Sequence, residues 1–191
     1  MIETLFIDRV WLAIILGVGA YAADYLLAGY EAFLYHAGAK NFIVLAGRYE
    51  QTTAIQQLEL KRRIVSVKFV APVVILAVTI FVVWQICIPE YNRPDLFAFL
   101  LGGLVLLEAS GIMQRARNVV LFHHARDAEG LQGKIEYSKR LVFTLNYTEQ
   151  YAFTALCGLL FLLTGSWFFL GGALTTFVSS RRLRDWTVMR T

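Results

Sequence analysis

Apolar residues along the chain are concentrated in long stretches that are separated by short polar segments. Most of these stretches approach the roughly 20 residues that an α-helix needs to cross a bilayer. The pattern therefore predicts an all-α, polytopic helical membrane protein with about five transmembrane helices. The expected spans cover residues 10–35, 66–87, 96–113, 141–163 and 167–183.

The composition agrees with this class. Of the 191 residues, 58% are apolar and 17% are charged, whereas soluble domains average about 45–50% and about 25%. The two cysteines, Cys87 and Cys157, form no CxxC motif, so neither a disulfide framework nor a thiolate metal site is indicated. We expect no cofactor, and we interpret the basic residues as topology determinants and phospholipid contacts, with no nucleic-acid partner.

The fourth and fifth spans come from one apolar run that can be divided in two ways. Residues 151–178 are too many for one crossing at 1.5 Å per residue, unless the helix is strongly tilted. Thr164-Gly165-Ser166 interrupts the run and is typical of a tight turn. We therefore favour two shorter spans over one long, tilted span.

A weak internal repeat relates residues 31–65 to residues 108–142 without a gap. Its register matches Glu31 with Glu108 and matches basic clusters near the end of each segment. We interpret the match as a duplication. It predicts two equivalent helical hairpins that extend into the cytoplasm, with turns at Thr52-Thr53 and at Glu129-Gly130.

The fifth span repeats part of the third. Phe168–Gly172 resembles Phe99–Gly103, and each segment ends in a pair of glycines. The chain is therefore expected to have three parts. These are a first transmembrane hairpin repeat (1–84), a second one (85–163), and a half-repeat helix with a basic tail (164–191).

The distribution of Lys and Arg tests the number of spans independently. With five spans, sixteen basic residues in the two hairpins and the tail face one side, and only Arg9 and Arg93 face the other. With four spans the division is twelve against six. Because cytoplasmic segments carry the excess of Lys and Arg, we favour five spans in the cell membrane, with the N-terminus outside and the C-terminus in the cytoplasm.

Basic residues at the base of each predicted hairpin are expected to contact anionic lipid headgroups, since they lie where a helix would enter the bilayer. They are Lys61, Arg62, Arg63, Lys139 and Arg140.

Ionisable residues inside the predicted spans are the candidate functional residues, because a charge in hydrocarbon is costly. Asp24 lies in the first span and Glu149 in the fourth, while Glu31 and Glu108 lie near the inner ends of theirs. One hypothesis is an acidic, amide-lined route for a cation. It would be formed by Asp24, Glu31, Glu108, Asn146, Glu149 and Gln150. The alternative is structural pairing, in which Lys68 neutralises Asp24 or Glu149 and the other glutamates bridge to nearby arginines.

No nucleotide-binding, zinc-protease or serine-hydrolase motif occurs, so an enzyme is not indicated. The leading hypothesis is a small integral membrane ion channel or transporter, for a cation, that works as a homo-oligomer because five short spans leave little room for a private pathway. The alternative is a non-transporting interaction or scaffold subunit whose cytoplasmic hairpins dock a partner. Transport predicts a hydrated cavity at Asp24 or Glu149, and the scaffold hypothesis predicts that these acids are paired.

Overall fold

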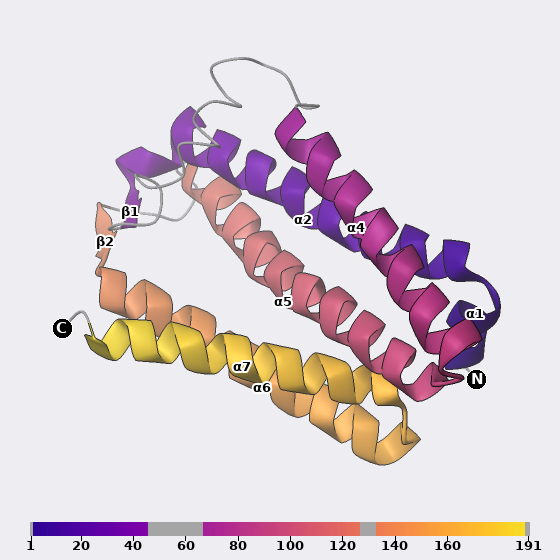
Figure 1. Cartoon of the computed structure of the whole chain (residues 1–191). Coiled ribbons are helices and arrows are strands. Elements are labelled where there is room, and N and C mark those ends of the chain that lie inside the picture. The colour runs from indigo at the N-terminus through magenta and orange to yellow at the C-terminus, as the bar shows by residue number, and fades with distance from the viewer. Residues whose placement is uncertain (1, 46–66, 127–132, 190–191) are drawn as a thin grey trace.

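The computed structural model describes residues 2–45, 67–126 and 133–189, which are almost entirely helical (Figure 1). The elements follow in this order: α1 (Ile2–Asp8), α2 (Val10–Ala37), a 3₁₀ turn (Ala39–Asn41), β1 (Ile43–Leu45), α4 (Val67–Gln85), a π-helical turn (Ile86–Glu90), α5 (Pro94–Arg126), β2 (Ile135–Tyr137), α6 (Lys139–Thr164) and α7 (Trp167–Met189). The predicted all-α class is confirmed.

Three helices in the described ranges are long and apolar enough to cross a membrane. They are Val10–Ala37, Phe69–Glu90 and Pro94–Arg126. These three helices are compatible with a multi-pass membrane protein. α6 and α7 carry more polar residues and are not among them, so the count of five spans stays a prediction.

The predicted break in the last apolar run is present. α6 ends at Thr164 and α7 begins at Trp167. Gly165 takes a left-handed conformation, with φ 64°, and its N–H donates a 2.7 Å hydrogen bond to the carbonyl of Phe161. This is a common way to end a helix, because glycine has no Cβ to oppose positive φ.

Two prolines shape the connection between α4 and α5. Pro89 lies in the π-helical turn that follows α4, and Pro94 is the first residue of α5, where its missing N–H costs no hydrogen bond. The N–H of Arg93 bonds back to the carbonyl of Cys87 at 2.7 Å. The connection between the π-helical turn and α5 is therefore three residues long, 91–93.

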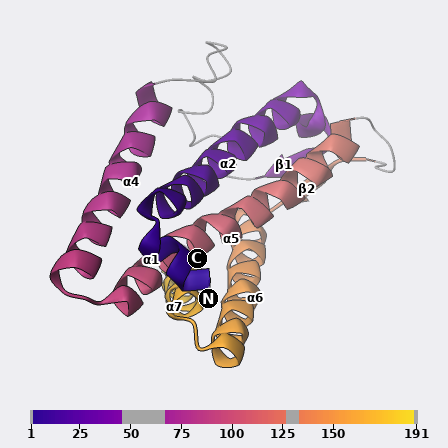
Figure 2. The same ribbon diagram turned by 90° about the vertical axis from the view of Figure 1, so that its right-hand side faces the viewer.

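The helices pack in the order α4, α2, α5, α7, α6, so α5 is central. Figure 2 shows α4 and α6 on opposite sides of α2 and α5. An apolar cluster joins α2, α4, α5 and α7 near the N-terminal end of α5; it includes Ala13, Ile80, Phe97, Leu101 and Phe168. Since α6 packs mainly on α7, its contacts with α5 are few and lie near its own N-terminal end.

The predicted equivalence of the two hairpins is not confirmed, because the described parts of the two segments differ. The two segments of the repeat are 77 residues apart, so the end of α5 at Arg126 corresponds to position 49. α2 ends well before that position, at Ala37. Gly38 follows α2, and the chain then forms β1, which pairs in parallel with β2. The fully buried Ile43 explains this path, because it packs with Phe122 near the end of α5. The predicted turns at 52–53 and 129–130 lie outside the described residues.

α5 and α7 contact each other through their matching glycine pairs. A Cβ on Gly102 would overlap the carbonyl of Phe168, and a Cβ on Gly171 would overlap the carbonyl of Phe99. Gly171 and Phe168 each come 69 residues after their counterparts Gly102 and Phe99. The second contact is therefore the first one with the roles of the two helices exchanged. The two helices also run in the same direction (Figure 1). The sequence echo therefore corresponds to a local two-fold relation between parallel helices.

Candidate functional site

The buried face of α5 changes character along the helix. Phe97, Leu101 and Val105 make it apolar near the start, whereas Ser110, Gln114 and Asn118 make it polar further on. The polar positions recur every fourth residue, so they form one line along the helix. This line faces the acidic residues that the sequence singled out.

Asp24 of α2 forms an ion pair with Arg115 of α5. The Nε of Arg115 lies 2.6 Å from Oδ1 of Asp24, and the two side chains are 28% and 17% exposed. Gly111 leaves room for this carboxylate, since a Cβ there would lie 3.1 Å from the same oxygen. Asp24 is therefore held against the backbone of α5.

Glu31 is the most deeply buried of the candidate acids, with its side chain 3% exposed. Its Oε1 accepts a 2.6 Å hydrogen bond from Nδ2 of Asn118, and its Oε2 lies 3.5 Å from Nη1 of Arg115. Arg115 thus contacts two carboxylates seven residues apart on one face of α2.

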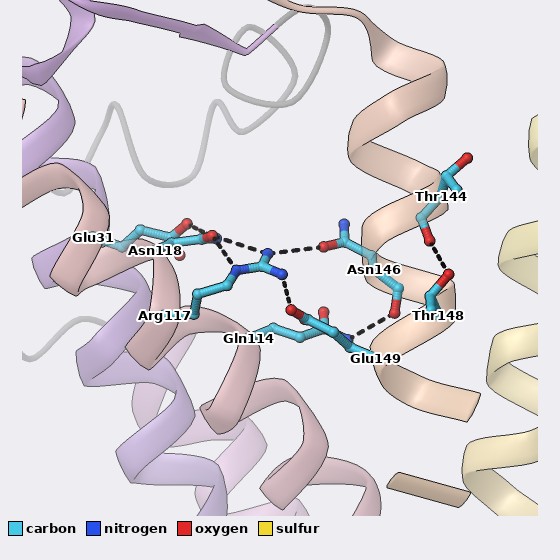
Figure 3. A network of polar contacts seen from close by, with 8 residues as sticks. All are labelled: Glu31, Gln114, Arg117, Asn118, Thr144, Asn146, Thr148 and Glu149. Atoms are coloured by element: carbon cyan, nitrogen blue, oxygen red, sulfur yellow. Dashed lines mark hydrogen bonds and ion pairs between the residues drawn. The ribbon is translucent and has the colours of Figure 1, made fainter. Parts of the chain in front are cut away.

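Arg117 makes the corresponding contacts with α6 (Figure 3). Its Nη1 forms an ion pair with Oε1 of Glu149, and its Nη2 lies 3.4 Å from Oδ1 of Asn146. The Nε2 of Gln114 donates a 3.3 Å hydrogen bond to the carbonyl of Asn146. Side chains therefore bridge α5 and α6 where the helices themselves do not pack closely.

The two arginines point to different helices because of their spacing. Two residues correspond to about 200° around an α-helix, so Arg115 faces α2 and Arg117 faces α6. Asn118 connects the two halves, because it donates to Glu31 and accepts from Arg117 at 3.1 Å. We call this set the arginine network: Asp24, Glu31, Gln114, Arg115, Arg117, Asn118, Asn146 and Glu149.

Polar contacts continue from α6 to α7. The hydroxyl of Ser180 lies 3.5 Å from Oε1 of Gln150, and the hydroxyls of Thr154 and Thr176 are 2.9 Å apart. Ser180 and Thr176 are fully buried. Each also donates to the carbonyl four residues earlier, which satisfies the hydroxyl inside its own helix.

Carboxylates outnumber guanidinium groups in this region of the described chain. Among the described side chains, four carboxylates (Asp24, Glu31, Glu108 and Glu149) lie near two guanidinium groups, those of Arg115 and Arg117, and Glu108 is half-buried on α5. In the described residues, Oε2 of Glu149 is buried and has no hydrogen-bond partner, and the same is true of the Tyr25 hydroxyl.

The structure brings together most of the candidate residues, but not as a single acidic group. Asp24 and Glu149 do not contact each other; they reach α5 from opposite sides. The side chain of Lys68 lies outside the described residues, so its suggested pairing is untested. Among the expected lipid contacts, Arg140 is exposed and Lys139 is the first residue of α6. Lys61, Arg62 and Arg63 lie outside the described residues.

The arginines were the residues whose importance the sequence reasoning missed. The charge distribution places Arg115 and Arg117 among the cytoplasmic topology determinants, although their helix is continuous with an apolar span. Two basic residues spaced to face opposite sides of such a helix are a usable signal. Gln114, Ser180 and Thr176 gave no comparable signal, because one polar side chain in a helix does not reveal its neighbour.

Comparison of the chain with protein-family models, with curated proteins and with solved structures found no match.

Proposed function

We propose that the chain is a non-transporting interaction subunit of a membrane, whose spans are held by the arginine network and whose cytoplasmic end contacts a partner. The observation that carries the proposal is that Asp24, Glu31 and Glu149 each contact an arginine of α5. A conducting route needs groups that are available to the ion. A carboxylate that is paired with an arginine of another helix instead holds the two helices together.

The direction of the network supports the same proposal. Its bonds run sideways, from α2 to α5 and from α5 to α6. Polar side chains that pair between membrane helices stabilise the association of those helices, because an unpaired polar side chain in hydrocarbon is costly. Arginine suits this role because its guanidinium presents several donors in a fixed plane and keeps its charge.

The proposal includes five spans, with the N-terminus outside. α7 supports this count because it lies beside α5 and runs parallel to it, and α5 is long and apolar enough to cross a membrane. The residues that meet are those that the sequence echo matches, Phe99–Gly103 and Phe168–Gly172. α6 packs along α7 in the opposite direction (Figure 1). Their buried hydroxyl and amide groups lower their apolar content without exposing those groups to lipid.

Cation or proton transport is the second candidate, favoured by the excess of carboxylates. Glu108 and the buried Oε2 of Glu149 are the groups with spare capacity. Transport that also used a paired acid would require one of the arginine pairs to open and release its carboxylate to the ion. Under this candidate, the pairs are a resting state and not a fixed joint.

A flux assay with purified protein in liposomes separates the two candidates. For an interaction subunit we expect proton, sodium and potassium flux equal to that of protein-free liposomes. For a transporter we expect flux that disappears in the variant Asp24→Asn/Glu149→Gln, while the variant keeps the elution profile of the folded protein. Cation flux in the wild type that the double substitution abolishes would contradict the interaction subunit.

A further inference from the structure

Among the described residues, β2 has one open edge, at the end of the molecule where α5 finishes and α6 begins (Figure 1). In the described chain the sheet has two strands, and β1 occupies only one edge of β2. Ile43 fixes β1 against the helices, whereas Lys134, Ile135 and Glu136 are all exposed. An unpaired edge offers backbone N–H and C=O groups to another strand.

The pairing with β1 determines which backbone groups β2 offers. The N–H of Ile135 donates to the carbonyl of Phe42 at 2.7 Å, so the backbone of Ile135 faces β1. Backbone direction alternates along a strand. The N–H and C=O groups of Lys134 and Glu136 therefore face the open edge.

We propose that this edge pairs antiparallel with the same edge of a second copy of the chain, centred on Ile135. An antiparallel pair of identical strands has a two-fold axis, and outward-facing residues must pair with outward-facing residues. The axis can then pass through residue 134, 135 or 136. An axis at 134 places Lys134 opposite Lys134 of the second copy, and an axis at 136 places Glu136 opposite Glu136. An axis at 135 instead places Lys134 of each copy opposite Glu136 of the other.

Charge is the reason to choose a second copy as the occupant. Edge strands often carry one sign of charge, which repels their own kind. Here Lys134 and Glu136 have opposite signs and already lie 3.0 Å apart on one face. In the dimer each would meet its opposite across the strands, and such cross-strand pairs are favourable. Ile135 of each copy would meet its equivalent on the other face.

A three-residue strand buries too little area to hold a dimer together by itself, and insertion of both copies in one membrane favours their association. So small an interface is far below the area that a stable soluble dimer buries. Two copies in one bilayer share their orientation and a restricted volume, which raises their effective concentration. A two-fold axis between them must run along the membrane normal. Figure 1 shows β2 turned across the direction of α6, as antiparallel pairing about such an axis requires.

Disulfide cross-linking in membranes tests the pairing. In Ile135→Cys the two Cα atoms would lie about 4.5 Å apart, as in a pair without hydrogen bonds, which is within disulfide range. We expect a cross-linked dimer after mild oxidation. Tyr137→Cys is the matched control, because it lies on the same face but roughly four residues from its equivalent, about 13 Å at the rise of a strand. Cys87 and Cys157 are buried, so the wild type should give no cross-link.

Charge exchange tests the register. In the Ile135→Cys background, Lys134→Glu or Glu136→Lys should each lower the cross-linked fraction severalfold, and the two together should restore it. Several outcomes would overturn the proposal: equal cross-linking at 135 and 137, no self-linked dimer, cross-linking only to another protein, or a charge exchange that does not restore pairing. The inference does not depend on the flux assay, because strand pairing is measured without transport.

Discussion

Arg115 and Arg117 organise the polar interior at the scale of single residues. Each is a partly exposed arginine that bridges α5 to an acidic residue on another helix. Breaking a buried pair by removing one partner is costly, because the remaining charge keeps its desolvation penalty and loses its attraction. Arg115 is the more sensitive position, since it contacts both Asp24 and the buried Glu31.

Replacing Arg115 with methionine should lower the free energy of unfolding by about 3–5 kcal/mol, the usual loss when a buried pair is broken. Denaturation of the purified protein in mild detergent measures this change. Adding Asp24→Asn should recover part of the loss, because it removes one of the two unpaired carboxylates. Arg93→Met is the matched control, because the Arg93–Asp95 pair is exposed and short-range. Equal losses at both arginines would contradict a buried role for Arg115.

At the scale of helices, α5 and α7 meet backbone to backbone at their glycines. The carbonyl of Phe168 in α7 occupies the place that a Cβ on Gly102 would take, and the carbonyl of Phe99 in α5 occupies the place of a Cβ on Gly171. Backbone cannot move aside as a flexible side chain can, so an added methyl group must separate the helices. Small residues commonly permit this kind of packing between membrane helices.

Gly102→Ala and Gly171→Ala should therefore each destabilise the protein by at least the roughly 1–3 kcal/mol typical of overpacking. Gly19→Ala and Gly158→Ala are matched controls on α2 and α6, where an added Cβ meets nothing within 4 Å. They should be neutral or stabilising, because alanine is the better helix former by about 0.5–1 kcal/mol. Thermal denaturation of the four variants measures the difference. A tolerated Gly171→Ala would contradict the close contact.

At the scale of the whole molecule, the number of crossings decides where the two ends lie. Five spans place the N-terminus and the C-terminus on opposite sides, and an even number places them together. The basic C-terminal part of α7 and the exposed Arg140 at the start of α6 then lie on the cytoplasmic side, where anionic lipids are concentrated. The same topology places β2 in the cytoplasm.

Cysteine labelling in intact cells tests this topology. A reagent that does not cross membranes should label Thr4→Cys from outside and should label Arg181→Cys only after the cells are opened. Both positions are exposed. The wild type provides the background, since Cys87 and Cys157 are 3% and 1% exposed. Labelling of both variants from the same side would rule out five spans.

The sequence by itself determined those features that depend on local chemistry. Apolar length located α2 and α5, Gly165 ended α6, and two prolines confined the α4–α5 connection. The glycine echo between Phe99–Gly103 and Phe168–Gly172 indicated related helices. Each of these follows from the properties of neighbouring residues, which tertiary structure left unchanged.

Only the tertiary structure decided which distant groups meet. The 77-residue repeat implied two equivalent hairpins, but Gly38 ends α2, and burial of Ile43 against Phe122 takes the first one along a different path. Likewise, the acids could be listed from the sequence, but their pairing with Arg115 and Arg117 depends on how α2 and α6 are placed around α5. A charge inside a membrane protein needs a partner, and helix packing selects that partner from residues far apart in the chain.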